Sequence, residues 1–398
     1  MESKTRLYLI IFLAFYFLAV SMIITGAVIP QWMDEFSVSA GRAGRLFAFY
    51  YLPYTIVTFC SGLLSQRWGK KVVLLLGQAF LAGGFFSVST SPSFSLIEWG
   101  LFLMGVGGGF SEAPFTSLLS QIFPGEEGYA LNLSQISFGL GAATAPFLAG
   151  FLLERGFSWR LFYLFPGVVS LVIFALLSRE KLLEEKGMEG GGKSPLRRRE
   201  GNGFIMVSFL AMFLYVGAEI GSSSWITTFL VKGLGGSLSW GGLALAVFWG
   251  ALTIGRFVFA FLSRSLSYPV ILRFSSFLSL IFLFFLNFTH EVHWAILALG
   301  GVGFGYSAVW PLIVAWVAQK MGEEQEKAIG FVVAFGGLGA IFFPWLGGVI
   351  GERWGLSYIF WVVWVLVLFL WLVFHSSYFR EGGKEVGAGR DRCGNEWV

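Results

Sequence analysis

The sequence predicts an all-α membrane protein whose twelve transmembrane helices form two pseudo-symmetric six-helix bundles. Apolar residues make up 56% of the 398 residues and charged residues only 13%, a composition that excludes an ordinary soluble domain. Apolar runs of about 20 residues follow one another, which is the length that crosses a hydrocarbon core ~30 Å thick. An internal repeat then divides the chain into two equivalent halves.

The repeat pairs residues of the two halves at a nearly constant spacing. An offset of 198 positions matches Gly139 with Gly337, Gly141 with Gly339, Pro146 with Pro344, Gly150 with Gly348, Glu154 with Glu352 and Arg155 with Arg353. Just upstream, an offset of 197 positions matches Pro114 with Pro311. Many secondary transporters consist of two homologous halves, so the repeat favours a transport protein.

The predicted spans follow one another, with most charged residues between them. In the first half the apolar runs cover residues 7–30, 42–64, 72–90, 96–118, 129–153 and 159–178. In the second half they cover residues 203–230, 240–262, 269–289, 294–318, 328–350 and 357–376. We therefore expect one bundle over residues 1–178, a second over 203–376 and a cytoplasmic tail over 377–398. Residues 179–202, rich in Glu, Lys, Arg and Gly, are typical of a flexible cytoplasmic linker.

The distribution of basic residues predicts the orientation of the spans. Nineteen of the 27 Lys and Arg residues lie in segments on the side of the two termini, and six lie in segments on the other side. Because Lys and Arg are retained on the cytoplasmic side, we expect a multi-pass protein of the cytoplasmic (plasma) membrane with both termini inside. The first span is expected to stay attached, because its apolar run is longer than a signal-peptide core and no small-residue cleavage site follows.

Several other classes of protein are excluded by the residues present. Cys60 and Cys393 are the only cysteines and offer no disulfide framework. The sequence pI of about 9.0 does not require a nucleic-acid partner. The excess basic residues lie in cytoplasmic loops, where they set the orientation of the spans and lie near anionic lipid. Residues 187–194 read GMEGGGKS and match a phosphate-loop pattern, but a charged run precedes them and Pro195 follows where a helix is needed. We therefore predict no cofactor, no metal and no enzyme activity.

The loop between the second and third spans carries a family signature. Residues 61–71 read SGLLSQRWGKK, which resembles the loop motif of the major facilitator superfamily. That motif has a Gly, then Asp and Arg after three residues, then another Gly and basic residues. Arg67 matches the family's Arg, whereas Gln66 replaces the Asp that helps to hold the inner face closed. The resemblance implies a gating role for Gln66 and Arg67, with neutral hydrogen bonds in place of a charge network.

Five further stretches resemble one branch of that superfamily, the fucose, glucose and galactose symporters. They are GAVIP at 26–30, ALNLSQISFGLGAATAP at 130–146, YVGAEIGSSSW at 215–225, FWGALTIGR at 248–256 and GFGYSAVWP at 303–311. The resemblance implies alternating access, with a sugar or similar small polar solute carried together with a proton or another cation.

Two acidic residues lie inside predicted spans, where a carboxylate is costly and is a functional candidate by default. Glu112 stands where the symporter branch has an acid implicated in proton coupling, and Glu219 lies in the seventh span. We predict both as coupling residues. The branch also has an acid in its first span, where this chain offers only Ser21 and Thr25. The hydroxyls of Ser222, Ser223 and Ser224 favour a local break in the seventh span.

Polar and aromatic residues of the spans are the predicted substrate contacts. Asn132 and Gln135 are three residues apart on one helix face, and their amides suit a hydroxyl-rich solute. The aromatic candidates are Tyr51, Tyr54, Trp225, Trp249, Tyr306 and Trp310. For Arg256 in the eighth span three roles stay open: gating through backbone carbonyls, pairing with Glu219 or Glu112, or binding an acidic substrate.

Small residues and rival functions complete the predictions. Gly105 and Gly109, like Gly301 and Gly305, are four residues apart, so they are expected to let neighbouring helices approach closely.

Residues 141–150 read GAATAPFLAG and resemble a drug-antiporter motif, which keeps efflux of amphipathic compounds as an alternative. A non-transporting membrane sensor or an ATP-driven machine is the alternative from a different class. One chain already holds two bundles, so we expect a monomer.

Overall fold

The computed structural model describes residues 2–122, 127–180, 202–321 and 325–380. Within these residues every regular element is a helix, and twelve stretches are long and apolar enough to span a membrane. This confirms the predicted fold class. Residues 181–201 of the predicted linker and 381–398 of the predicted tail lie outside the described residues.

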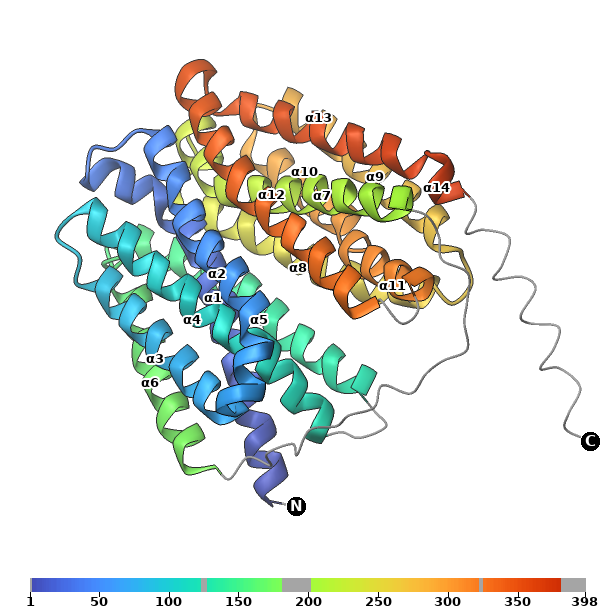
Figure 1. The fold of residues 1–398 in the computed structure, drawn as a ribbon. Coiled ribbons are helices and arrows are strands. Elements are labelled where there is room, and N and C mark those ends of the chain that lie inside the picture. Colours follow the sequence, from blue (N-terminus) through green and yellow to red (C-terminus); the bar gives the residue numbers. More distant parts are fainter. Residues whose placement is uncertain (1, 123–126, 181–201, 322–324, 381–398) are drawn as a thin grey trace, which may run out of the picture.

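The helices follow the two halves of the sequence (Figure 1). The first half contains α1 (Glu2–Glu35), α2 (Ala40–Trp68), α3 (Lys70–Ser89), α4 (Phe94–Ile122), α5 (Glu127–Glu154) and α6 (Leu161–Arg179). The second half contains α7 (Asn202–Thr228), the π-helical turn η1 (Phe229–Gly233), α8 (Leu238–Leu262), α9 (Tyr268–Phe288), α10 (Val292–Tyr306), α11 (Val309–Met321), α12 (Gln325–Trp354), α13 (Ser357–Phe374) and α14 (Ser377–Arg380).

The tenth span consists of two helices, α10 and α11, separated at Ser307 and Ala308. Pro311 accounts for the break, because proline has no N–H to donate to the carbonyl of residue 307 and its ring clashes with that carbonyl.

The prediction of a local break at Ser222–Ser224 in the seventh span was wrong. Helix α7 continues through these residues, and the hydroxyls of Ser222 and Ser224 donate to carbonyls one turn back, at 2.6 Å in each case, so they are paired within the helix.

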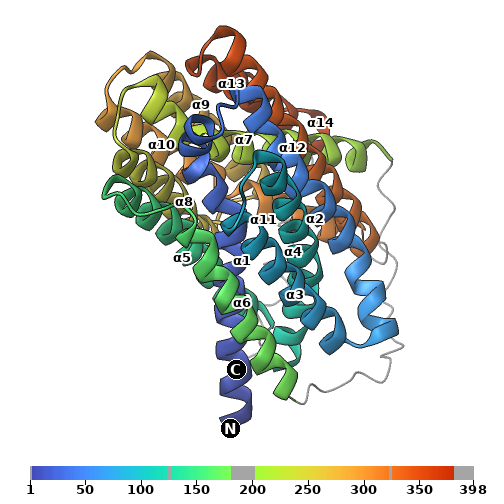
Figure 2. The same cartoon turned by 90° about the vertical axis from the view of Figure 1, so that its left-hand side faces the viewer.

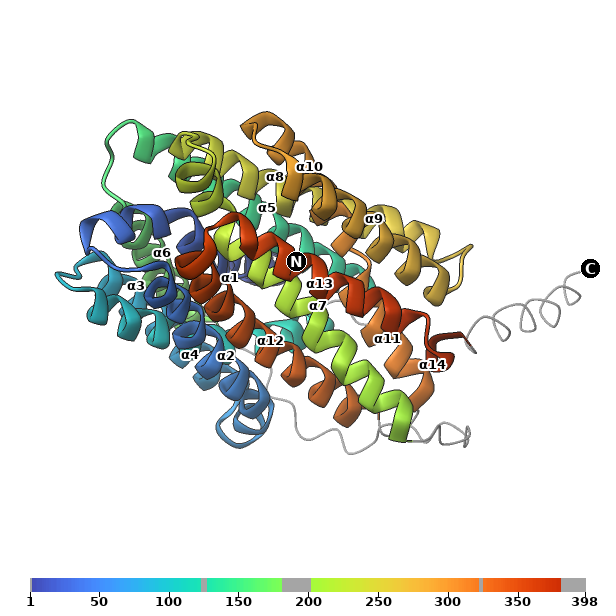
Figure 3. The ribbon, with the colours of Figure 1, turned by 90° about the horizontal axis from the view of Figure 1, so that it is seen from above.

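Two long interfaces join the halves. Helix α2 packs along α12, and α5 packs along α8, with α1 against α7 between them. We call the end of the bundles that carries loops 36–39 and 234–237 the far end, because it lies opposite Glu2 and Arg380, the first and last described residues. The bundles meet at the far end and diverge toward the opposite end (Figures 1 and 2). Seen from above, the helices of the two halves lie on opposite sides of the α2–α12 and α5–α8 contacts (Figure 3).

Glycines allow the closest approaches between helices within each bundle. A Cβ on Gly105 would overlap the carbonyl oxygen of Tyr50 in α2, and one on Gly305 would overlap the Ser279 hydroxyl in α9. The predicted role of these small residues in packing is therefore confirmed.

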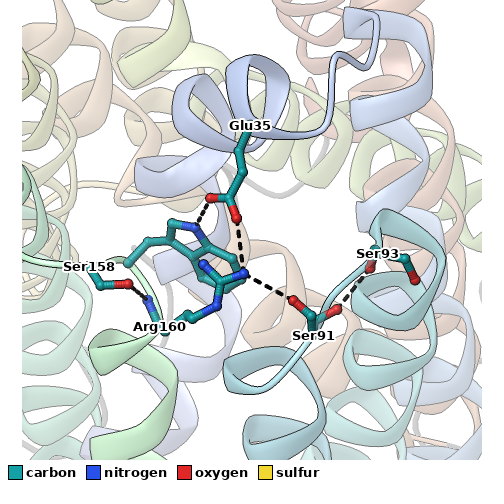
Figure 4. A network of polar contacts seen from close by, with 6 residues as sticks. Glu35, Ser91, Ser93, Ser158 and Arg160 are labelled. Carbon is teal, nitrogen blue, oxygen red and sulfur yellow. Dashed lines mark hydrogen bonds and ion pairs between the residues drawn. The ribbon is translucent and has the colours of Figure 1, made fainter.

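At the far end of the first bundle, a network of hydrogen bonds joins the end of α1 to the loops that follow α3 and α5 (Figure 4). The Glu35 carboxylate, at the end of α1, accepts hydrogen bonds from Trp159 Nε1 at 2.5 Å and Arg160 Nη2 at 2.9 Å. Arg160 Nη2 also donates to the Ser91 carbonyl at 3.1 Å. The ends of α1, α3 and α5 are thereby joined, so we expect this end of the bundle to move as one body.

Candidate functional site

The first bundle contributes an acid surrounded by tyrosines. Tyr50, Tyr51 and Tyr54 lie on one stretch of α2, with ring centroids 5.2 to 6.2 Å apart. The Tyr54 hydroxyl donates a hydrogen bond to the Glu112 carboxylate of α4. Tyr50 in turn shares a hydrogen bond of 2.8 Å with Ser21 of α1. Three helices of this bundle therefore direct polar groups to one place.

The second bundle offers a similar arrangement around Glu219. This side chain is only 7% exposed, and its carboxylate accepts a 2.8 Å hydrogen bond from Tyr215 on the preceding turn of α7. The Tyr215 ring lies edge-on to Tyr306 of α10 with centroids 6.0 Å apart. Phe248 of α8 connects Tyr306 to Trp249, with ring distances of 6.0 and 5.6 Å.

The two arrangements face each other across the bundle interface. Tyr51 lies within electrostatic interaction range of both Glu112 and Glu219. The rings of Phe138 in α5 and Trp249 in α8 are 6.5 Å apart and join the bundles at this level. We call these residues the central cluster: Tyr50, Tyr51, Tyr54, Glu112, Phe138, Tyr215, Glu219, Phe248, Trp249 and Tyr306.

One buried donor of the central cluster has no hydrogen-bond partner among the described residues. It is the indole Nε1 of Trp249, a residue that is 3% exposed, whereas the hydroxyl of Tyr306 has the Ser222 hydroxyl as a neighbour. A buried polar group without a partner costs about 1–3 kcal/mol, so such groups need a reason. A bound polar solute would supply the missing partner.

Arg256 connects the central cluster to the first bundle. Its Nη1 donates a 2.8 Å hydrogen bond to the side-chain oxygen of Gln135 in α5. The guanidinium also lies within electrostatic range of Glu219. Of the predicted partners, Glu219 is therefore near but not in direct contact, whereas Gln135 receives the hydrogen bond. The pair of Gln135 and Arg256 spans the α5–α8 interface.

Other predicted residues lie away from the central cluster. Trp225 is fully buried, and its indole N–H donates to the Pro344 carbonyl at 2.9 Å, so in this structure it packs between α7 and α12. Trp310, at the start of α11, is 38% exposed. Gln66 and Arg67 are exposed at the end of α2. Asn132 belongs to α5, but its side chain lies outside the described residues.

Several members of the central cluster were not predicted from the sequence. Tyr215 precedes Glu219 by four residues, which places both on one helix face, and this spacing was the available signal. Tyr50 precedes Tyr54 by the same four residues, but its hydrogen bond to Ser21 joins it to another helix and had no signal in the sequence. Phe138 is likewise connected only through Trp249, which belongs to the other half of the chain.

The chemistry available here is hydrogen bonding and proton exchange. The described residues include no group of three or more His, Cys, Asp or Glu side chains suited to a metal ion. Two carboxylic acids, each hydrogen-bonded to a tyrosine, are able to take up or release a proton within the membrane region, where such acids mark proton pathways and substrate sites.

The fold and this cluster define a multi-pass membrane transporter built from two six-helix repeats with polar groups between them. The model of the Major Facilitator Superfamily matches residues 9–326 and 302–391, and the chain belongs to that family. It is thus a transporter of small molecules rather than an enzyme.

Relatives and solved structures agree with this assignment. The chain is 26% identical over 358 residues to protein TsgA of Shigella flexneri, which covers 89% of this chain and 90% of that protein. A bacterial homologue of the human lysosomal transporter Spinster superposes with a TM-score of 0.80 at 14% identity, covering 96% and 98% of the two chains. The fucose:proton symporter FucP of E. coli superposes with a TM-score of 0.62 at 17% identity, covering 94% and 98%. These structural likenesses establish the fold.

Proposed function

We propose that the protein moves a small polar solute, in the first place a sugar, across the cytoplasmic membrane by alternating access, coupled to a proton or another cation. The observation that carries this proposal is the central cluster. Glu112 from one bundle and Glu219 from the other both lie within electrostatic range of Tyr51, and the buried indole N–H of Trp249 has no hydrogen-bond partner among the described residues. Directional donors and acceptors suit a hydroxyl-rich solute, and buried acids suit proton coupling.

The proposed cycle assigns roles to the two bundles. Residues 1–178 and 203–376 rock against each other around the central cluster, with residues 179–202 as the linker. In this proposal the termini face the cytoplasm and the far end faces outward, so bundles that meet at the far end correspond to the inward-facing state of the cycle. Glu112 and Glu219 couple the cation, and Gln66, Arg67 and Arg256 act in gating. A single chain suffices, because both bundles come from it.

The proposal is tested with purified protein and a panel of ligands. Sugars, organic acids and cationic dyes are screened for an increase in thermal stability, because a ligand that binds only the folded state stabilises it by mass action. Hits are then tested for uptake into proteoliposomes with and without a pH gradient. Stabilisation and gradient-driven uptake of a sugar support the proposal, whereas stabilisation by dyes alone contradicts it.

Efflux of amphipathic compounds is the second candidate, favoured by the ring contacts among Phe138, Trp249, Phe248 and Tyr306. A polar solute depends on individual hydrogen bonds, whereas an amphipathic compound depends mainly on apolar contact.

Changing Gln135 or Asn132 to Ala separates the two candidates. For a sugar we expect binding at least about tenfold weaker, since an unpaired buried polar group costs roughly 1–3 kcal/mol. Isothermal titration with the identified substrate measures the change. Normal binding by both variants, together with loss of binding by Trp249→Ala, contradicts the sugar assignment and favours efflux.

The alternative of an ATP-driven machine is tested at Lys193. This residue belongs to GMEGGGKS, which lies outside the described residues. We expect Lys193→Ala to leave uptake unchanged, because the segment serves as a linker. Loss of uptake together with loss of ATP binding would overturn this expectation.

A further inference from the structure

At the far end, each bundle places a carboxylate against the beginning of a helix in the other bundle. Glu352, in the last turn of α12, accepts a 2.9 Å hydrogen bond from the backbone N–H of Gly41 in α2. Glu154, the last residue of α5, accepts bonds from the N–H of Ser239 at 2.8 Å and the hydroxyl of Ser237 at 2.9 Å, both at the start of α8. Both interfaces between the bundles therefore end in the same type of contact.

The two contacts are equivalent under the internal repeat. An offset of 198 positions carries Glu154 onto Glu352 and Gly41 onto Ser239. The receiving helices also share their N-cap, because Ser39 caps α2 and Ser237 caps α8. The same offset relates the acceptor, the donor and the cap, so the contacts obey the pseudo-two-fold symmetry of the molecule.

An ion pair lies between these contacts. Lys232, in the turn after α7, pairs with Asp34 near the end of α1, and these residues are themselves 198 positions apart. When two equivalent positions of a repeat contact each other, the contact lies on the symmetry axis. The far end is thus closed by one ion pair on the axis with one carboxylate contact on either side.

Glycines bring the helices close enough for the carboxylates to reach. A Cβ on Gly242 of α8 would overlap the Pro146 carbonyl oxygen, and one on Gly44 of α2 would collide with the Pro344 carbonyl oxygen. These two pairs are again related by 198 positions. The backbones of α2 and α12, and those of α8 and α5, are therefore in close contact at this end.

We infer that Glu154 and Glu352 are paired gating residues, and that both must release their helix before the far end opens. The first N–H groups of a helix have no partner within the helix, and the positive end of the helix dipole attracts a carboxylate. Here those partners come from the opposite bundle, so separating the bundles removes them. The inference rests on alternating access, as proposed above, and is independent of the solute and the coupling ion.

The test measures the distance between the bundles at the far end by double electron–electron resonance without solute. Spin labels are attached after Pro92→Cys and His290→Cys, two exposed positions in far-end loops of different bundles, in a background with Cys60→Ser and Cys393→Ser. We expect Glu154→Ala or Glu352→Ala to raise the ratio of open to closed far ends roughly 2- to 30-fold each, the usual effect of removing a helix cap. The double variant should multiply the two effects, since the sites are separate.

Glu35→Ala is the matched control, because Glu35 lies at the same end but, within the described part of the chain, bonds only to Trp159 and Arg160 of its own bundle. It should leave the distance distribution unchanged. Should a glutamate variant fail to purify, Ser239→Pro removes the donor instead, since proline is tolerated in the first helical turn, and the same shift is expected. A double variant with the wild-type distribution, or an equal shift with Glu35→Ala, would overturn the assignment. Failure of solute uptake alone would count against the proposed function and leave this measurement unaffected.

Discussion

Replacing Glu112 with Gln is expected to abolish solute accumulation driven by a pH gradient while leaving solute exchange largely intact. Gln has nearly the same shape and still accepts the hydrogen bond from Tyr54, but it neither binds nor releases a proton. Exchange needs no net proton movement and should continue. A gradient of 1 pH unit is equivalent to about 1.4 kcal/mol per proton, or about tenfold accumulation, and the variant should lose this entirely.

Proteoliposome uptake with and without an imposed gradient measures the effect. Glu98→Gln serves as the matched control, because Glu98 is the other acid of α4, is buried and lies near Arg45, at 3.9 Å, away from the central cluster. The control should accumulate solute like the wild type. Gradient-driven accumulation by Glu112→Gln would show that another group carries the proton, with Glu219 as the next candidate.

Replacing Gly105 with Val is expected to cause the largest loss of stability among the changes considered. A side chain here would overlap the Tyr50 carbonyl and collide with the Pro53 ring, so α2 and α4 must separate. Overpacking of a well-packed core costs about 1–3 kcal/mol and sometimes more, and here the obstacle is backbone that has no other rotamer. The same displacement moves Tyr50 and Tyr54, so solute binding should fall too.

Thermal unfolding in detergent, followed by size-exclusion fluorescence, measures this loss. Gly83→Val in the neighbouring helix α3 is the control, because a Cβ at Gly83 meets nothing within 4 Å. We expect the control to unfold at the wild-type temperature. If the two variants unfolded at the same temperature, close packing of α2 against α4 would not explain why residue 105 is a glycine.

Most of the fold could be predicted from local features of the chain. Apolar runs long enough to cross a bilayer predicted all twelve spans, since a spanning backbone must satisfy its own hydrogen bonds as a helix. The break in the tenth span was missed although Pro311 signals it. The break expected in the seventh span did not occur, and the serine hydroxyls there bond to carbonyls of the continuous helix.

The site was less predictable. Glu112 and Glu219 were found because charge is rare within spans. The rotation of each helix about its own axis decided which residues became their partners. It also decided that Trp225 lies away from the central cluster and that Arg256 contacts Gln135. Composition does not report this rotation.

The sequence by itself determined that this is a duplicated, twelve-span transporter of the Major Facilitator Superfamily, because hydropathy and repeat spacing are carried by neighbouring residues. The repeat also paired Glu154 with Glu352 without indicating what either residue does. Only the tertiary structure placed each of these carboxylates at a helix start in the opposite bundle, and brought Tyr51 within range of two acids on different helices. The physical reason is that such contacts join segments far apart in the chain, and helix packing alone decides which of their faces meet.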